Sequence, residues 1–482
     1  MDAGDLAGRL WGHLGGEPAA LDRLRVTGPA DVLPSVFPVT AAAAASVAVA
    51  TLAVADVWRR RGGPPAAGVT VDTRHAALAC RSERYVTAAD RELGGLWDTI
   101  AGDYRAADGW IRLHTNFRAH RAAAVRVLGL TGEIDPAPVA AAVAGWRAGD
   151  LEDAVHAAGG CAAALRPMDA WRASAQAAAL VTRPLVAIDA LDAPAAPVAA
   201  AAADRADRPV SLRPLDGLRV LDLTRVIAGP VAGRFLAAHG AHVLRVDGPA
   251  AEDSPVLVAD TTVGKRATVL DLATTRGAEL FADLLDRADV VLAAYRPGAL
   301  AGLGLAPEVL ASQRPGLVVG TLSAYGGAGV GPWGGRRGFD SLVQMATGLA
   351  DEGRRAAGDP DGPPRPLPAQ LLDHATGYLL AAGVLRALGA RLADGRPRAV
   401  TVSLARTSCW LDELGRWGAP DVAAPPADLP ADLAVALDGP LGRTRHVACP
   451  GTVAGAPPSW ATGPVPLGHD APAWDVTGPG LR

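Results

Sequence analysis

Apolar positions follow two alternating periods over residues 217–410. Short apolar runs of strand length are separated by segments in which apolar residues recur every three or four positions. The expected strands are 218–224, 241–247, 267–272, 289–295, 317–325 and 399–407. The expected helices are 230–240, 274–288, 306–315, 339–350 and a long one that begins near Asp373. This order predicts a mainly parallel sheet with right-handed crossovers, and ligands of such folds lie at the carboxyl ends of the strands.

The long helix carries a carboxylate at its start. The stretch LPAQLLDHATGYLLAAG places Asp373 before an alanine-rich segment that continues to Asp394-Gly395, with a core stripe at Leu385, Leu388 and Leu392. Aspartate is a preferred N-cap residue. A helix N-terminus also offers free N–H groups and a favourable dipole to an ionised side chain. Both roles, cap and functional carboxylate, are compatible with this position.

The order of a helix, a Gly/Pro-rich turn and the triplet VTV occurs twice. Aligning Val69–Val71 with Val400–Val402 places Ala42 opposite Asp373. If the two regions are copies, the first copy therefore lacks the carboxylate. The alternative is that two unrelated alanine-rich helices happen to precede similar strands.

The first of these helices includes the apolar run 39–55. Its length stops just short of the roughly 20 residues that span a membrane. It consists mostly of alanine with few large apolar groups, so we expect a buried helix and no membrane partner.

Composition changes mark two boundaries. Pro, Ala and Asp interrupt every apolar period in 191–216, which is typical of a linker. The segment 411–482 is Pro-rich, and we expect an extended tail held down by Trp460 and Trp474.

Charge and cysteine content exclude several classes of function. The 482 residues carry 46 basic and 50 acidic side chains, a formal net charge of -4, which gives no field of the kind that nucleic-acid binders use. The four cysteines form no CxxC pair, so we expect neither a metal site nor a disulfide framework. The N-terminal residues do not resemble a secretory signal, and a cytoplasmic location is expected.

Five segments in order resemble the class III CoA-transferases, the CaiB/BaiF family. They are LDLTRVIAGPVAGRFLAAHGAHVLRVD, GKRATVLDL, YRPGAL, RRGFDSLVQMATG and LLDHATGYLLAAG, and the resemblance covers about 217–408. It implies an α/β fold, with a Rossmann-like, mainly parallel sheet and flanking helices in a large domain, plus a smaller α+β domain.

The resemblance also suggests a domain order. Residues 108–129 and 158–180 look like the family's small domain, which usually lies downstream of the catalytic half. The chain thus resembles a fused two-copy enzyme with a truncated first copy. The expected parts are a degenerate large-domain remnant (1–80), a small domain (81–190), the linker (191–216), a catalytic CoA-binding large domain (217–410) and the tail (411–482).

The family's nucleophile position falls on Asp373. Enzymes of this class move CoA from an acyl-CoA to a small carboxylic acid through an aspartyl anhydride and an aspartyl-CoA thioester. No permanently bound cofactor is implied, because coenzyme A is part of the substrate. The family commonly forms interlocked homodimers, so the resemblance implies a homodimer or a pseudo-dimeric monomer.

The residues expected to contact coenzyme A come from three places. Arg225, Val226, Ala228 and Gly229 lie in the first strand–helix turn, where backbone amides and an arginine suit phosphates. Lys265 and Arg266 match the family's basic pair, and Tyr295 matches an aromatic position suited to stacking on adenine. The glycine-rich segment 325–338 could be a mobile cover or a loose loop, and we favour the loop.

Three alternatives remain. An α-methylacyl-CoA racemase needs two facing bases, but this chain has Phe339 where the racemases have histidine. A nicotinamide-dependent dehydrogenase is disfavoured, since the turn RVIAGPVAG lacks GxGxxG. A catalytically inactive CoA-binding subunit is compatible with a truncated first copy.

Overall fold

A seven-stranded sheet forms the centre of the molecule in the computed structural model, which describes residues 2–197, 211–295, 298–299 and 301–474. Its strand order is β10-β9-β8-β11-β12-β13-β7, and every strand is parallel to its neighbours except β7. The strands are β7 (Ala187–Ala190), β8 (Arg219–Leu223), β9 (His242–Asp247), β10 (Arg266–Val269), β11 (Val290–Ala293), β12 (Val318–Ser323) and β13 (Arg398–Ser403). The prediction of a large, mainly parallel sheet with flanking helices is confirmed. The edge strand β7 was not predicted.

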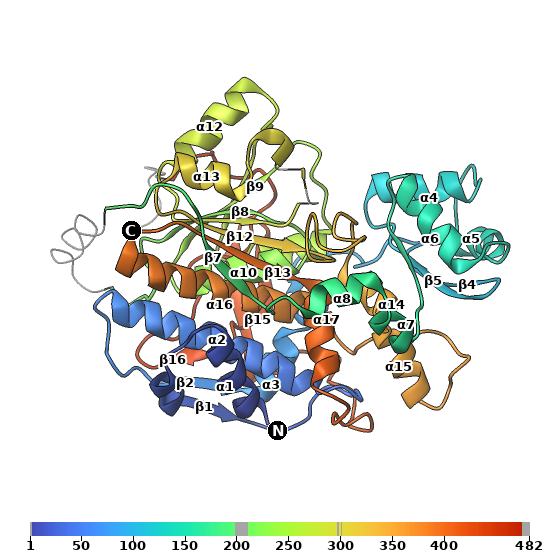
Figure 1. Cartoon of the computed structure of the whole chain (residues 1–482), viewed down its shortest axis with the longest axis horizontal. Coiled ribbons are helices and arrows are strands. Elements are labelled where there is room, and N and C mark those ends of the chain that lie inside the picture. Colours follow the sequence, from blue (N-terminus) through green and yellow to red (C-terminus); the bar gives the residue numbers. More distant parts are fainter. Residues whose placement is uncertain (1, 198–210, 296–297, 300, 475–482) are drawn as a thin grey trace.

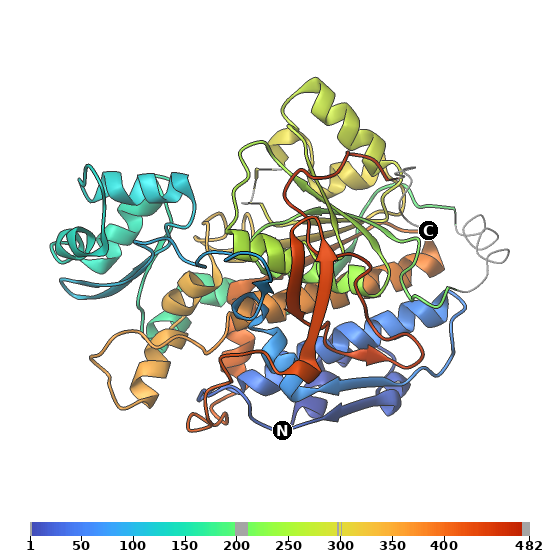
Figure 2. The same ribbon diagram turned by 180° about the vertical axis from the view of Figure 1, so that it is seen from behind.

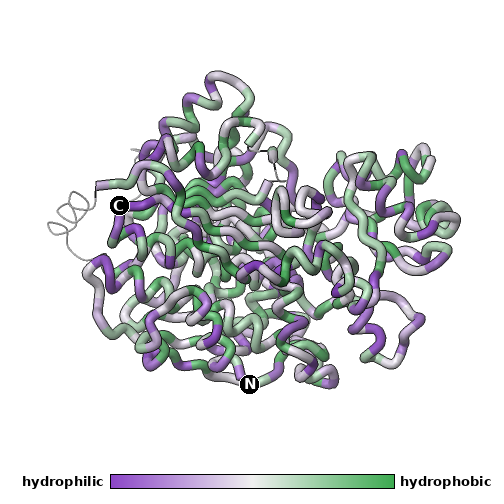
Figure 3. The backbone as a smooth tube through the Cα atoms, viewed as in Figure 1, coloured by the Kyte–Doolittle hydropathy of each residue, from purple (hydrophilic) through white to green (hydrophobic). Residues whose placement is uncertain are grey.

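Helices cover both faces of this sheet (Figure 1). One face packs against α12 (Thr275–Leu285) and α13 (Pro307–Gln313), and the other against α10 (Ala228–Ala238) and α16 (Leu371–Asp394). Further helices of this half are α11 (Pro255–Thr261), α14 (Asp340–Ala346), α15 (Leu349–Ala356) and α17 (Leu404–Glu413). The strands are largely buried because helices lie on both faces, and Figure 3 shows hydrophobic residues concentrated along them.

The first 80 residues form a layer below α16. This layer contains α1 (Ala3–His13), β1 (Leu24–Thr27), α2 (Val39–Arg60), β2 (Val69–Asp72) and α3 (Thr73–Ala79). The long helix α2 lies against α16. Within the described residues, α2 is the single helix long and apolar enough to cross a membrane, and its apolar part is entirely buried in the protein, as expected for a core helix.

A second, smaller unit stands apart from these layers on the right of Figure 1. It contains the antiparallel sheet β4 (Gly102–Ala106), β5 (Gly109–Leu113) and β6 (Ala162–Ala164), with α4 (Arg118–Val127), α5 (Pro136–Val143) and α6 (Ala148–Ala157). Its apolar residues form a core cluster of their own between Ile100 and Ala164. The following helices, α7 (Met168–Arg172) and α8 (Ala175–Val181), pack on the main core instead.

The C-terminal segment differs from the expected extended tail. It contains the hairpin β14 (Ala434–Gly439) and β15 (Gly442–Val447), which pairs with β3 (Thr87–Ala88), and then β16 (Thr452–Val453), which pairs with β2. Figure 2 shows this hairpin running between the sheet and the N-terminal layer. Strands β15 and β16 were not predicted, because Pro-rich segments flank them and their partners β3 and β2 lie far away in the sequence. Trp460 and Trp474 are buried, and their indole N–H groups donate to Arg234 O (2.9 Å) and Leu284 O (2.8 Å).

Parts of two predicted segments fall outside the described residues, namely 198–210 of the linker and 475–482 of the tail. The domain boundaries, and the idea that the chain is a fused pair of copies, remain predictions.

Candidate active site

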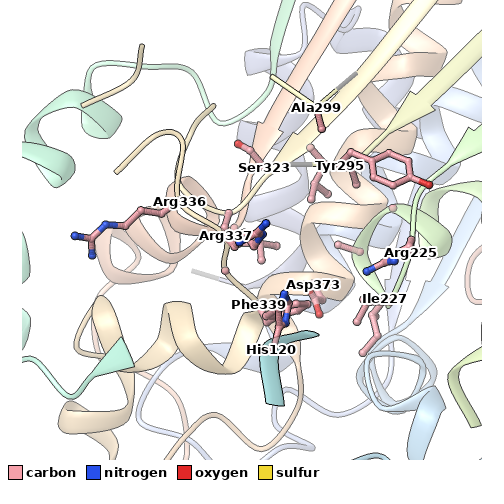
Figure 4. A pocket seen from close by; sticks show the side chains of 18 residues that line it. His120, Arg225, Ile227, Tyr295, Ala299, Ser323, Arg336, Arg337, Phe339 and Asp373 are labelled. Atoms are coloured by element: carbon pink, nitrogen blue, oxygen red, sulfur yellow. The ribbon is translucent and has the colours of Figure 1, made fainter. Parts of the chain in front are cut away.

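A cavity of about 330 Å³ lies at the carboxyl ends of β8, β11 and β12, a volume typical of small-molecule sites. The order of the sheet reverses beside it, since β9 and β10 lie on one side of β8 while β11 and β12 lie on the other. Figure 4 shows the side chains around it. The lining residues include His120, Arg225, Val226, Ile227, Ala228, Gly229, Ala294, Tyr295, Ser323, Arg336, Arg337, Phe339 and Asp373.

Asp373 lies in the first turn of α16, where it lines the cavity with only 5% of its surface exposed. It is not the N-cap, because that position is Gln370 and makes no side-chain cap. The structure therefore excludes the cap as the role of Asp373. The backbone N–H of Asp373 donates to Asp340 Oδ2 at 3.1 Å.

Two buried carboxyl groups, Asp373 and Asp340, thus meet at this helix start. Burial raises the pKa of Asp340 to about 6, although hydrogen bonds from Gln344 and the Asp373 amide lower it. The pKa of Asp373 lies well above its usual value because of burial, and the charges of Asp340 and Glu83 raise it further. Asp373 is consequently a stronger base than a surface aspartate, and it loses its charge at a higher pH than a surface aspartate does.

A buried pair lies on the other side of the same helical turn. His374 Nε2 lies 3.0 Å from Glu83 Oε2, and both side chains have no exposed surface. Glu83 belongs to the short 3₁₀ helix η2 (Ser82–Arg84), which directly follows the N-terminal layer. Sequence reasoning missed this contact because nothing local connects residues so far apart in the chain.

The turn between β8 and α10 forms the next wall of the cavity, and four predicted coenzyme contacts meet there: Arg225, Val226, Ala228 and Gly229. Val226 has a φ of 69°. Positive φ is a strained conformation for a β-branched residue, and such strain is found preferentially at functional sites. Gly229 is required for packing, because a Cβ there would lie 2.3 Å from Thr224 Cβ.

Lys265 and Arg266 do not line the cavity, contrary to their expected role as coenzyme contacts. Lys265 is 1% exposed, and its Nζ donates to Asp222 Oδ2 (2.8 Å) and Pro230 O (2.9 Å). Helix α10 passes so close to this pair that a Cβ at Gly233 would lie 2.9 Å from Lys265 Nζ. Arg266 instead donates to the C-terminal segment, at Ala471 O and Ala473 O. Lys265 and Arg266 both match the family's motif in sequence, but in the structure their side chains make contacts within the protein core and with the C-terminal segment.

Tyr295 lines the cavity at the end of β11 with its side chain half-buried. Burial raises the pKa of its phenol, so the ring stays uncharged at neutral pH. The structure thus brings together Asp373, Tyr295 and the turn 225–229, and leaves Lys265 and Arg266 outside.

An aromatic cluster forms the floor near Asp373. The rings of Phe339 and His114 stack with their centroids 3.7 Å apart. The ring centroids of Phe117 and His120 lie 5.7 and 5.9 Å from that of Phe339. The Arg225 guanidinium lies 4.6 Å from the Phe117 ring. Burial and the neighbouring guanidiniums lower the pKa of His120 to about 4, so its imidazole is neutral.

Sequence reasoning also missed His120 and Arg337. Residues 108–129 resembled the family's small domain, but nothing in that segment indicated that His120 would reach Asp373's cavity. Arg337 comes from the glycine-rich segment 325–338, which is a loop without helix or strand, as favoured from the sequence. The side chain of Gln176 from α8 holds this loop at three points. Its Nε2 donates to Tyr325 O and Val330 O, and its Oε1 accepts from the Trp333 amide.

Among the residues that the structure describes, no group of three or more His, Cys, Asp or Glu side chains is arranged to hold a metal ion. The arrangement places one buried carboxylate, that of Asp373, beside a cavity large enough for a small molecule. Arg225 and Arg337 supply positive charge for an anionic ligand.

The part of the chain that contributes most of this cavity's lining matches a known family. The model of CoA-transferase family III matches residues 215–414. The chain is 38% identical over 205 residues to a probable fatty acyl-CoA transferase of Mycobacterium tuberculosis, covering 40% of this chain and 50% of that protein. It is 32% identical over 208 residues to a succinyl-CoA–D-citramalate CoA-transferase of Chloroflexus aurantiacus, covering 40% and 49%. The chain spans about half the length of the curated relatives that it matches.

Solved structures give similar partial matches. The crystal structure of the same Mycobacterium tuberculosis protein is 37% identical, with a TM-score of 0.38 over 42% of this chain and 57% of that one. A CaiB/BaiF family protein from Brucella suis is 25% identical, with a TM-score of 0.37 over 48% and 65%. Scores this low support no argument about the arrangement of the whole chain.

Proposed function

We propose that the protein moves CoA from an acyl-CoA donor to a carboxylic acid acceptor, with Asp373 as the nucleophile, because residues 215–414 match the model of CoA-transferase family III. The observation that carries the proposal is the position of Asp373 at the N-terminal turn of α16, inside a cavity that it shares with Arg225 and Tyr295. The relatives' names, which include acyl-CoA and succinyl-CoA transferases, support the same general activity.

The proposed chemistry needs no group beyond the substrates and Asp373. A carboxylate oxygen of Asp373 attacks the thioester carbonyl, the C–S bond breaks, and CoA leaves as a thiolate from a mixed anhydride. The thiolate then attacks Cγ of Asp373, which releases the donor acid and leaves an aspartyl-CoA thioester. The acceptor carboxylate reverses both steps, giving the new acyl-CoA and a free Asp373 carboxylate. No net proton or water is consumed.

The surroundings of Asp373 suit this role. Burial and the nearby charge of Asp340 raise the pKa of Asp373, and a more basic carboxylate is a better nucleophile while it is ionised. Asp373 also lies at the N-terminal end of α16, where the helix dipole favours negative charge. The rate should therefore fall as the pH drops through the raised pKa of Asp373.

The coenzyme would bind along the wall made by Arg225, Val226, Ala228 and Gly229, with the adenine stacked on Tyr295. The strand order, which reverses beside this wall as in doubly wound nucleotide-binding sheets, supports the Rossmann-like interpretation. Lys265 has no part in this proposal, because its ammonium group is buried against Asp222.

The test is to trap the covalent intermediate. The protein is incubated with a panel of acyl-CoA esters, then treated with hydroxylamine or borohydride, and its peptides are examined by mass spectrometry. We expect a modification at Asp373, and a loss of transfer of at least about a thousandfold in Asp373→Ala. Asp361→Ala, which removes an exposed aspartate nearby in the sequence, is the matched control. Full CoA transfer by Asp373→Ala would show that the nucleophile is misassigned.

A racemase-like activity is the second candidate, and one observation favours it. Phe339 replaces the racemases' histidine, but His120 from α4 lines the same cavity as Asp373 and is neutral, as a proton acceptor must be. Exchange of the α-proton of a 2-methylacyl-CoA in D₂O, absent in His120→Gln, would support it. The remaining alternative is a catalytically inactive CoA-binding subunit. It would bind acyl-CoA but give no covalent adduct at Asp373.

The other expectations become part of the proposal. Acyl-CoA and a small carboxylic acid are the partners, coenzyme A is a substrate moiety, and the location is cytoplasmic. The contact between α2 and α16 supports a pseudo-dimeric monomer. In this monomer the N-terminal layer (1–80) is the degenerate first copy of the large domain, and 81–190 contains the small domain. A native mass measurement separates this monomer from a homodimer.

A further inference from the structure

The segment that joins the N-terminal layer to the smaller unit is attached to the catalytic half at three consecutive residues. Arg81 Nη1 donates to Pro368 O (2.8 Å), just before α16. Ser82 Oγ donates to Asp260 Oδ2 (2.8 Å) and accepts from Arg234 Nη2 (2.8 Å). Glu83 Oε2 lies 3.0 Å from His374 Nε2. This segment therefore holds the chain on both sides of the turn that presents Asp373.

The Glu83–His374 contact is the most deeply buried of these. A buried carboxylate is costly unless it is paired, and removing one partner of such a pair is strongly destabilising. Among the described residues, the other oxygen of Glu83, Oε1, accepts no hydrogen bond and lies 3.8 Å from Arg84 Nε. The pairing of Glu83 within the core consequently depends on His374.

Neighbouring helical residues point in directions about 100° apart, which explains how one turn serves two purposes. Asp373 faces the cavity, while His374 faces η2 and is completely buried. A rotation of this turn would move Asp373 relative to the bound thioester, and displacements of about 1 Å can cost about a hundredfold in rate. Fixing His374 therefore fixes the nucleophile.

We propose that Glu83, which comes from the N-terminal side of the chain and lies outside the family match, is a positioning residue for Asp373 that acts through His374. The inference rests on the proposed function for its kinetic consequence. It means that a segment of the chain outside residues 215–414 contributes to the active site.

The charges around the two groups determine what a variant should do. Asp373 is faced by Asp340 from α14 and Glu83 from η2, and Arg225, Arg337 and His120 line the same cavity. Glu83 is faced by His374 from α16, and by Arg84, Arg81 and Cys80 from its own segment. Glu83→Gln removes one negative charge that faces Asp373 but keeps an oxygen that can accept from His374 Nε2.

The experiment compares Glu83→Gln and Glu83→Ala with the control Asp56→Asn. Asp56, on α2, pairs with Arg386 of α16 at 2.6 Å, so the control weakens another ion pair between the N-terminal part and the same helix. Arg386 lies roughly 20 Å along the helix from Asp373. All three variants are assayed for kcat, KM and their pH dependence with the best acyl-CoA donor.

We expect Glu83→Ala to lower kcat by about tenfold or more with little change in KM, because the turn loses its anchor. Glu83→Gln should recover most of kcat and move the acidic limb of its pH profile to lower pH, since a negative charge facing Asp373 is gone. Asp56→Asn should keep the profile of the unmodified protein. Wild-type kcat and an unchanged profile in both Glu83 variants would overturn the proposal, as would an equal shift in Asp56→Asn.

A second measurement separates this inference from the proposed function. Labelling of Asp373 by a carbodiimide and a small amine, followed by peptide mass spectrometry across pH, reports the protonation of Asp373 without any substrate. The midpoint should move to lower pH in Glu83→Gln and stay unchanged in Asp56→Asn. If no acyl-CoA is turned over, the transferase proposal fails, but this shift still tests the coupling, and its absence refutes it.

Discussion

Helices α2 and α16 lie side by side and each leads into a strand and then a short helix, yet only α16 begins at the cavity. Each is followed by a turn, a strand that pairs in parallel with an earlier strand, and a short helix: α2, β2 and α3 in one case, α16, β13 and α17 in the other. Figures 1 and 2 show the two long helices in adjacent layers. The helix–strand unit itself therefore does not determine function.

The difference lies at the helix start. In α16 the first turn lines a cavity and carries Asp373, whose backbone N–H is held by Asp340. In α2 the corresponding residue, Ala42, has no exposed surface and lies in the main apolar core. The Asp373 carboxylate lines a cavity, whereas a carboxylate at position 42 would lie among apolar side chains with no partner.

Exchanging the two residue types should produce the largest effect. We expect Ala42→Asp to destabilise the protein by about 3–5 kcal/mol, because it buries a carboxylate without a partner. Urea denaturation followed by circular dichroism measures the change, and Ala42→Ser is the control for added volume. A loss below about 1 kcal/mol would mean that α2 also has room and partners for a carboxylate, which would remove the distinction between the helices.

The packing around the two helices should differ as well. At Gly377 in α16, an added Cβ would lie 2.4 Å from Ala228 O, in the turn that lines the cavity. The corresponding residue of α2 is Ser46, which already has a side chain and donates to Ala42 O. We expect Gly377→Ala to cost about 1–3 kcal/mol despite the better helix propensity of alanine.

The same Gly377→Ala change should lower transfer activity through the displaced turn, whereas Ser46→Ala should change stability by less than about 0.5 kcal/mol. Thermal denaturation and the acyl-CoA assay measure the two effects. Equal stability losses in both variants would indicate that the two helices are packed equally closely.

The smallest expected effect concerns the two ends of α16. Burial and the charges of Asp340 and Glu83 raise the folded-state pKa of Asp373, so its ionisation opposes folding above the usual pKa of an aspartate. Asp373→Asn should therefore stabilise the protein by about 1 kcal/mol near pH 8, and this gain should disappear as the pH falls towards 4.

Asp394 at the C-terminal end is the matched control with the opposite sign. A hydrogen bond from Arg398 lowers the pKa of Asp394, so its contribution to stability is present above the usual aspartate pKa and is lost at lower pH. Asp394→Asn should slightly destabilise the protein at pH 8. Melting temperatures of both variants from pH 4 to pH 8 check the two directions, and parallel curves would contradict the assignment for Asp373.

Much of the sheet could be predicted from sequence, because its strands are short apolar runs separated by periodic helices. The hairpin β14–β15 could not, since its partner β3 lies hundreds of residues earlier and Pro-rich flanks obscure its pattern. Among the candidate site residues, Asp373 and the turn 225–229 do line one cavity, because both lie at the carboxyl edge of a parallel sheet. Lys265 matched a motif equally well, but its position under α10 directs its ammonium group to Asp222.

The sequence by itself determined the order of strands and helices and the place of Asp373 at the start of a long helix, because these depend on local periodicity and on helix-end chemistry. Only the tertiary structure decided which side chains surround that carboxylate. Asp340, His120 and the Glu83–His374 pair come from separate parts of the chain and meet near Asp373 only in the fold. Burial there shifts the pKa values of Asp340, Asp373 and His120. Desolvation and through-space charge depend on distance in the fold, which no local pattern of residues records.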